Sequence, residues 1–440
     1  MDPLVGTLVL IMLALLGARF SFSTERVPPG PRLLFRTGTH FLVLGFLLGP
    51  AGAGLLSREA TEQLFPFMAL GLGWVGFHFG LQLDRRSLRQ FPPAYHALAF
   101  GQALLSFGLF AGLAWLLLRL TGLAGDVPPF VLLAAAAISS VTTPAGIAMV
   151  SSNFLVRGNV RDLLFFIASL DALVGITALQ VVYALFRPDG SVGGAAPGQL
   201  TLVMAAVGLG VVMGIVFLWL VRRRPRAEEL VLFVLGICAF AAGAALQWGL
   251  SPLFVSVVMG AVVANVHRDR QRVFTLLERW EKPVYLTFLL LAGALLHVPS
   301  GWVLLLALAY GLLRVLTKGA ASAALVTVTP LGMDVPRRLG LGLVPQGGIA
   351  LAMAVSGVLM YPDVRIRGTG AEMALFTIVA VGVLLSELSG PFLTVKLLRR
   401  AGEISPRVEE ALAEGDQRRA EREAIRHTIP PDRVSGEGDD

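Results

Sequence analysis

The sequence predicts an all-α polytopic membrane protein with about thirteen transmembrane helices. Of its 440 residues, 55% are hydrophobic and only 15% are charged, and the mean hydropathy is +0.74. Apolar runs of about 20 residues recur from end to end, each long enough for a helix to cross a hydrocarbon layer of about 30 Å. Strands are excluded, because backbone in lipid must be satisfied within a helix or a closed barrel, and these runs lack barrel alternation.

The predicted spans follow one another with short loops between them. They cover roughly residues 3–20, 37–56, 63–82, 96–118, 128–150, 162–185, 199–221, 229–248, 251–266, 283–299, 301–328, 339–360 and 372–398. The start of the chain, "MDPLVGTLVLIML", lacks the basic region of a signal peptide, so it is predicted to remain as the first span. Residues 1–400 are therefore predicted to form one membrane domain.

Basic residues in the loops predict the orientation of this domain. The loops after odd-numbered spans carry 20 Arg and Lys residues, whereas the loops after even-numbered spans carry five. By the positive-inside rule, the protein lies in the cytoplasmic membrane with its N-terminus outside and its C-terminus in the cytoplasm. The formal net charge of +7 reflects these loops and does not indicate a nucleic-acid partner.

The chain changes in character at about residue 401. Residues 401–440 are polar and mixed in charge, and they end in an acidic run. So few apolar residues cannot form a folded domain. The sequence predicts a cytoplasmic tail with one short helix followed by disorder.

One carboxylate lies near the centre of the sixth span. In "RDLLFFIASLDALVGITALQVVYALF", Asp171 is about 14 Å along a helix from Asp162 at the predicted cytoplasmic end. An aspartate at that depth costs on the order of 3 kcal/mol, so it should face a cavity, a partner or water. The simpler alternative is a structural acid that pairs with a neighbouring helix.

Three further charged side chains are embedded in predicted spans. Arg314 and Lys318 are four apart on one helical face, where like charges repel. Lys318 is too deep to reach water, so it needs a carboxylate, backbone carbonyls or deprotonation. Arg314 is predicted to be a packing cation or to take part in function, and Lys318 either a structural clamp or a participant. Glu387 in the last span could hold a cation or a backbone end, or could titrate during function.

Two spans are predicted to be interrupted. Pro144 lies within "SSVTTPAGIAMV" of the fifth span, and Pro345 lies within "GLVPQGGIALAMA" of the twelfth. Proline removes a backbone hydrogen bond and glycine loosens the helix further. The second interruption continues with Gln346, Gly347 and Gly348. Unwound backbone at membrane depth is tolerated only beside a protein-lined cavity, although a simple kink remains the alternative.

The two interruptions occupy matching places in the two halves of the chain. Each precedes a span with an embedded acid, Asp171 in the first half and Glu387 in the second. This arrangement is typical of secondary transporters with inverted repeats, whose site lies where the interruptions meet. It predicts that residues 1–400 are a transporter domain.

Several segments resemble the cation/proton antiporter superfamily, in particular its Kef-like and sodium/proton exchanger-like members. They include "FLVLGFLLGPAGAGLL", "FHFGLQLDRRSLRQF", "SSVTTPAGIAMV", "ASLDALVGI", "LLRVLTKGAASA", "GLVPQGGIALAMA" and "LSELSGPFLTVKLLRRAGE", in the family's order. The resemblance implies the sodium/proton antiporter fold, with two crossed unwound helices, a homodimer and elevator-like alternating access. It matches the essential aspartate of the family to Asp171 and its core lysine or arginine to Lys318.

The sequence also departs from the family pattern. Leu170 stands where an aspartate or asparagine usually precedes the essential aspartate, and Thr143 stands in the middle of the usual Thr-Asp-Pro or Thr-Ser-Pro. Gln82 and Gln346 replace a frequent glutamate and a frequent arginine. Each change removes a charge or an ion ligand.

These residues predict a site for a monovalent cation, Na⁺ or K⁺, at Asp171. The hydroxyls of Thr142 and Thr143 and the freed carbonyls would complete an oxygen shell of the kind that hard cations prefer. Since burial penalises a charged carboxylate, proton and cation would compete for Asp171. Lys318 is predicted to stay protonated and, lacking an acid at Leu170, to turn to Glu387 or to the C-terminal end of a half-helix. The exchange would then be electroneutral.

The predicted function is therefore secondary active transport that exchanges protons for a monovalent cation. A sodium-coupled symporter of an organic anion could use the same fold, and a non-transporting membrane sensor is the second alternative. The sequence contains no paired-aspartate, HExxH or Ser/His motif of an intramembrane enzyme, so no enzymatic activity is predicted. The single cysteine, Cys238, indicates neither a disulfide nor a metal cluster, and no cofactor is expected besides the transported ions.

Overall fold

The computed structural model describes most of the chain, and nearly all of the described part is helical. The described residues are 12, 35, 37–55, 63–123, 125–186, 198–223, 225–267, 270–296, 301–361, 365–366, 369–414 and 416–428. The predicted first span, apart from residue 12, and the end of the tail at 429–440 lie outside them.

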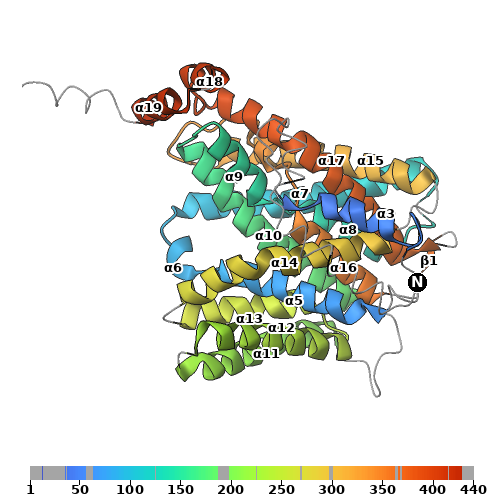
Figure 1. The fold of residues 1–440 in the computed structure, drawn as a ribbon. Coiled ribbons are helices and arrows are strands. Elements are labelled where there is room, and N and C mark those ends of the chain that lie inside the picture. The colour runs from blue at the N-terminus through green and yellow to red at the C-terminus, as the bar shows by residue number, and fades with distance from the viewer. Residues whose placement is uncertain are drawn as a thin grey trace, which may run out of the picture.

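The elements are labelled in Figure 1. The helices are α3 His40–Leu48, α5 Phe65–Leu81, α6 Arg85–Leu88, α7 Pro93–Leu120, α8 Pro129–Ser139, α9 Pro144–Asn153, α10 Asn159–Leu185, α11 Gln199–Leu220, η1 Val221–Arg223, α12 Ala227–Gln247, α13 Pro252–Val266, α14 Arg270–Leu295, α15 Gly301–Val328, η2 Leu339–Leu343, α16 Gly348–Met360, α17 Ala371–Arg400, α18 Pro406–Ala413 and α19 Gln417–Thr428. Two antiparallel strands of two residues each, β1 Arg365–Ile366 and β2 Thr369–Gly370, form a small hairpin before α17.

Seven helical segments within the described ranges are long and apolar enough to cross a membrane. They are Pro93–Leu120, Pro129–Asn153, Asn159–Leu185, Gln199–Arg223, Ala227–Gln247, Gly301–Val328 and Ala371–Arg400. Shorter apolar helices cover Phe65–Leu81, Pro252–Val266, Pro283–Leu295 and Gly348–Met360. The structure thus has the predicted all-α membrane architecture, while the total of thirteen spans stays a prediction.

The largest difference in helix boundaries is at α14, which begins at Arg270 and not at the predicted residue 283. Its first part is amphipathic: Val273 and Leu277 are buried, whereas Arg272, Glu278 and Arg279 are exposed. A search for uniformly apolar segments therefore places the start of this helix too late in the chain. Pro283 lies inside it without ending it.

The helices form two bundles. We call α3, α5 and α11–α14 the scaffold bundle, and α7–α10 with α15–α17 the core bundle, because each group packs mainly within itself. Figure 1 shows α11, α12, α13 and α5 side by side along one edge of the molecule. In the scaffold bundle α5 and α13 approach very closely at Gly80 and Gly260, where any side chain would collide with the facing backbone.

The segment after α17 folds back onto the core bundle. Glu403 accepts hydrogen bonds from the backbone N–H groups of Val160, at 2.6 Å, and Arg161, at 3.0 Å, in the first turn of α10. Helices α18 and α19 pack against each other and against Leu155 in the loop before α10. The sequence predicted one short helix in this tail, but the structure contains two, because the apolar residues spaced along each helix find partners only when the two helices meet.

We expect Glu403→Gln to alter how stability depends on pH. Burial raises the pKa of the Glu403 carboxyl, and the hydrogen bonds from Val160 and Arg161 offset this only in part. The folded protein therefore holds a proton that the unfolded chain releases, so this residue's contribution to stability falls as pH rises from the usual glutamate value, about 4.3, through the raised value. In thermal unfolding between pH 4 and pH 8, the variant should show a smaller decline than the wild type. Glu410→Gln, at an exposed position of α18, is the control and should behave as the wild type.

Candidate ion-binding site

The two interrupted helices cross at their unwound segments in the core bundle. Helix α8 ends at Ser139, and α9 begins at Pro144 after Thr143, its N-cap residue. The second interruption lies between η2 and α16, and it contains Pro345. The Thr143 N–H donates to the Pro345 carbonyl at 3.0 Å, so the two segments are joined directly. Both interruptions lie at the prolines from which the sequence predicted them.

Glycines make this crossing possible. A Cβ atom on Gly347 would lie 2.9 Å from the Thr143 hydroxyl oxygen. A Cβ atom on Gly348 would overlap the phenol group of Tyr285 on α14. Only the absence of a side chain at both positions allows the chain to pass between α9 and the scaffold bundle.

Asp171 lies at the crossing, completely buried. Its Oδ1 accepts a hydrogen bond from the Thr142 N–H at 3.0 Å, and its Oδ2 accepts one from the Thr142 hydroxyl at 2.6 Å. The Lys318 ammonium lies 2.7 Å from Oδ2. The carboxylate of α10 therefore holds the unwound segment of the first interrupted helix and faces one cation.

Lys318 uses all three of its donors at this place. Besides Asp171, its Nζ donates to the Ser140 carbonyl and, at 3.0 Å, to the Thr142 hydroxyl. Ser140 is the C-cap of α8, so Lys318 does contact the C-terminal end of a half-helix. The alternative prediction, a contact with Glu387, is wrong within the described residues. The reason is that Asp171 itself lies within reach.

Arg314 has a different role, because its partners are backbone carbonyls of both interruptions. The guanidinium donates to the Ser139 carbonyl and to the Val141 carbonyl at 2.6 Å. It also donates to the Leu343 and Val344 carbonyls, each at 3.2 Å. Helix interruption leaves such carbonyls without their usual partners. Arg314 is thus a packing cation that joins the two unwound segments.

Tyr310 also belongs to this cluster, although no sequence pattern described above predicts it. Its hydroxyl accepts from the Gln346 side-chain N–H at 3.0 Å, and the same Gln346 nitrogen donates to the Ile138 carbonyl at 2.8 Å. Tyr310 precedes Arg314 by four residues on α15, as Arg314 precedes Lys318. This i, i+4, i+8 row of polar side chains on one helical face was the signal that could have found it.

Thr143 does not join this cluster. Its hydroxyl accepts from the Ala145 N–H at 3.4 Å as the N-cap of α9, and its side chain lies beside Gly347. The structure therefore corrects the predicted pair of threonine ligands. Only Thr142 places its hydroxyl on Asp171, because the two side chains point in different directions from the extended backbone.

Comparison with known families decides what kind of protein has this site. The family model described as "Sodium/hydrogen exchanger, transmembrane" matches residues 10–406. The chain belongs to the sodium/hydrogen exchanger family. A search of curated protein sequences finds no match for this exchanger.

Solved structures agree with this assignment at the level of the fold. The structure of the sodium proton antiporter MjNhaP1 from Methanocaldococcus jannaschii at pH 8 matches with a TM-score of 0.64 and 17% identity, over 90% of this chain and 99% of that one. An electron-microscopy structure of the same antiporter matches with a TM-score of 0.61 and 18% identity, over 90% and 98% of the two chains. The fold of this exchanger is thus the antiporter fold that the sequence predicted.

Oxygen atoms at the crossing are the groups of this exchanger that could hold a cation. They are the Asp171 carboxylate, the Thr142 hydroxyl and the carbonyls that now face Lys318 and Arg314. Within the described ranges no group of three His, Cys, Asp or Glu side chains converges. The Lys318 ammonium lies beside Asp171 Oδ2, at 2.7 Å.

Glu387 lies apart from this pair. Its Oε2 accepts from the Thr37 hydroxyl at 3.2 Å, and Thr37 lies 2.9 Å from the Thr39 hydroxyl just before α3. Its Oε1 is buried and has no hydrogen-bond partner among the described residues. Glu387 therefore connects α17 of the core bundle to the start of the scaffold bundle, and neither buried cation contacts it.

Glu387→Gln is expected to keep both the fold and cation-driven proton movement in this exchanger. The amide oxygen can still accept the hydrogen bond from Thr37, and no cation loses a counter-charge. The apparent Tm in detergent and the proton movement in proteoliposomes would test this, with Ser389→Ala on the exposed side of α17 as a control. A folded variant without proton movement would contradict this expectation and show that exchange needs the Glu387 carboxyl.

Proposed function

We propose that this protein exchanges protons for a monovalent cation, Na⁺ or K⁺, across the cytoplasmic membrane. The observation that carries the proposal is the buried Asp171 at the crossing of two unwound helices, in a chain of the sodium/hydrogen exchanger family. In one state Asp171 carries a proton, and in the other it holds the cation. Because burial penalises a bare carboxylate, a proton, a cation or the Lys318 ammonium is needed beside Asp171 in every state.

Lys318 competes with the cation for the same oxygen. When a cation enters at Oδ2, the ammonium has to give up its contact with Asp171, at present 2.7 Å. It keeps its contacts with the Ser140 carbonyl and the Thr142 hydroxyl, which stabilise its charge. Lys318 thus stays protonated, and one proton exchanges for one cation without net charge transfer. Electroneutral exchange carries no net current. A voltage-dependent current measured during exchange would therefore refute this stoichiometry.

The division into two bundles supports alternating access. The core bundle contains both unwound segments, Asp171 and the buried side chains of Arg314 and Lys318. A movement of that bundle against the scaffold bundle therefore carries the complete site. We place the scaffold bundle at the interface of a homodimer. The basic loops support an orientation with the N-terminus outside and the C-terminus in the cytoplasm.

The decisive experiment is proton movement in proteoliposomes with a preset pH gradient. Na⁺, K⁺, Li⁺ and choline are added in turn to wild-type protein and to Asp171→Asn. Collapse of the gradient by one alkali cation, only when Asp171 is present, is the expected result and identifies the ion. No response to any cation from folded, inserted protein would refute the proposal.

A matched pair of threonine variants tests the geometry of the site. Thr142→Val removes the hydroxyl that contacts both Asp171 and Lys318, and we expect about a tenfold higher cation concentration for half-maximal exchange, the effect of losing about one hydrogen bond to a charged group. Thr143→Val removes a hydroxyl that only caps α9, so its cation dependence should equal that of the wild type. Equal effects of the two variants would contradict this assignment.

A further inference from the structure

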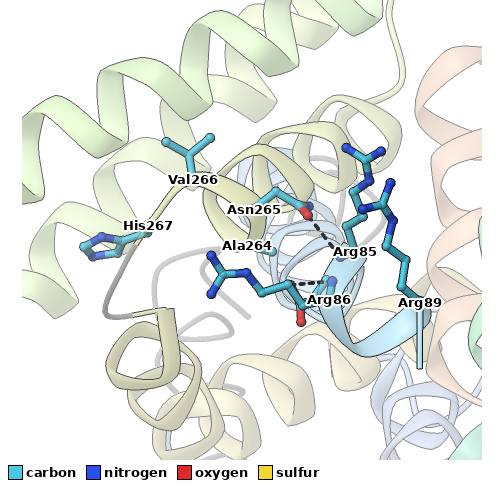
Figure 2. A pocket seen from close by; sticks show the side chains of 8 residues that line it. Arg85, Arg86, Arg89, Ala264, Asn265, Val266 and His267 are labelled. Carbon is cyan, nitrogen blue, oxygen red and sulfur yellow. Dashed lines mark hydrogen bonds between the residues drawn. The ribbon is translucent and has the colours of Figure 1, made fainter.

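A basic pocket lies at the connection between the two bundles. It has a volume of about 610 Å³ and is lined by Arg85, Arg86 and Arg89, together with Asn265 and His267 at the end of α13. Figure 2 shows Arg85 and Arg89 directed to the same side, as expected for residues four apart, with Arg86 extending in the direction of His267. The pocket is remote in sequence from Asp171 and shares no residue with the cation site.

The backbone around the pocket is held in place from both bundles. Asn265 accepts a hydrogen bond from the Arg85 N–H at 3.0 Å and donates to the Leu83 carbonyl at 2.9 Å, which fixes the start of α6 to the scaffold bundle. On the far side of α6, the Phe91 ring lies 4.4 Å from the Phe166 ring of α10, centroid to centroid, in the core bundle. The short helix α6 is therefore the joint through which α5 continues into α7.

The buried Asp84 carboxylate also lines the pocket, but no ion pair joins it to the three arginines in the described part of the chain. Arg85, Arg86 and Arg89 are exposed, and none forms an ion pair within the described part of the chain. The Asp84 carboxylate instead caps α6, because it accepts hydrogen bonds from the N–H groups of Arg86, at 3.3 Å, and Ser87, at 2.9 Å. Two like charges four residues apart repel each other, and an anion between them relieves that repulsion.

We propose that this pocket binds a phosphate group, and that its occupancy slows the movement of the core bundle. Guanidinium groups bind phosphate oxygens in pairs of parallel hydrogen bonds, and two arginines on one face can hold one phosphate together. The loop belongs to the set of basic loops that is predicted to face the cytoplasm, where both lipid headgroups and soluble phosphate compounds are present. A phosphate held there would bridge Arg85 and Arg89 across α6, which Asn265 already fixes to the end of α13, and would stiffen the joint.

Binding is tested without any transport measurement, so its outcome does not depend on the proposed exchange. The apparent Tm of the full-length protein in neutral detergent is followed against phosphatidic acid, phosphatidylcholine and inorganic phosphate. Phosphatidic acid should raise the Tm of the wild type, and phosphatidylcholine should not. A similar rise with inorganic phosphate identifies a soluble anion as a sufficient ligand, whereas a rise with phosphatidic acid alone identifies a lipid headgroup.

Matched variants separate this pocket from general surface charge. R85Q/R89Q should lose the response, and R85K/R89K should need about tenfold more ligand because lysine lacks the planar fork of arginine. R222Q/R223Q, at exposed positions of η1 in another basic loop, should respond as the wild type. No response in the wild type, an equal loss in R222Q/R223Q, or an unchanged half-saturating concentration in R85Q/R89Q would overturn the site. If R85Q/R89Q does not fold, R85K/R89K decides in its place.

The effect on the joint rests on the proposed exchange and needs a second measurement. In proteoliposomes of phosphatidylcholine, adding the ligand that bound should slow cation-driven proton movement by the wild type and leave R85Q/R89Q unchanged. Binding without any change in wild-type exchange would overturn the effect on the joint while leaving the phosphate site in place.

Discussion

Asp171→Asn is expected to reduce cation-driven proton movement to the level of empty liposomes. The asparagine amide does not take up and release a proton near neutral pH, and it does not offer the negative charge that a cation needs. The change also leaves the buried Lys318 ammonium without its counter-charge, and breaking one partner of a buried pair costs about 3–5 kcal/mol. Proton movement in proteoliposomes and the apparent Tm in detergent are both measured.

Loss of function and loss of stability are separated by a second variant. Asp171→Asn/Lys318→Gln removes both charges, so we expect its apparent Tm to lie above that of Asp171→Asn while proton movement stays absent. A double variant that is as unstable as Asp171→Asn would contradict the pairing of Lys318 with Asp171. Exchange by Asp171→Asn would contradict the role of Asp171 itself.

Arg314→Met is expected to have the largest effect on stability of any single substitution in the core bundle. It removes the donor of the Ser139, Val141 and Val344 carbonyls, while the Leu343 carbonyl keeps the Thr142 hydroxyl at 3.0 Å. A buried acceptor left without a partner costs about 1–3 kcal/mol, so three of them together remove a large part of a typical margin of stability. We expect little monodisperse protein after purification and a strongly lowered apparent Tm.

Graded variants test this role of Arg314. Arg314→Lys keeps a charge but can reach fewer of the carbonyls, so its apparent Tm should fall between those of the wild type and Arg314→Met. Arg222→Met, at an exposed position, is the control for loss of an arginine. A stable Arg314→Met variant with wild-type exchange would show that the unwound segments hold together without this guanidinium.

Sequence patterns alone predict the all-α membrane architecture and the positions of the unusual residues. Apolar runs define spans because lipid admits only internally bonded backbone. Pro144 and Pro345 mark interruptions for the same reason, since each lacks a backbone N–H. Asp171 is conspicuous because burying a charge at that depth costs free energy, however the helices are arranged. These are properties of single residues or short windows, so they need no knowledge of neighbouring helices.

Tertiary structure alone decided which of these residues meet. Lys318 pairs with Asp171, 147 positions away in the chain, and not with Glu387, because that choice depends on how α10, α15 and α17 are rotated about their axes. The same reason explains why Thr142 contacts Asp171 while its neighbour Thr143 caps α9. Arg314 satisfies carbonyls of both interruptions only because the two segments cross beside α15. Contacts between distant segments set the directions of the side chains at such a crossing. The hydrophobic periodicity of the sequence contains no information about these contacts.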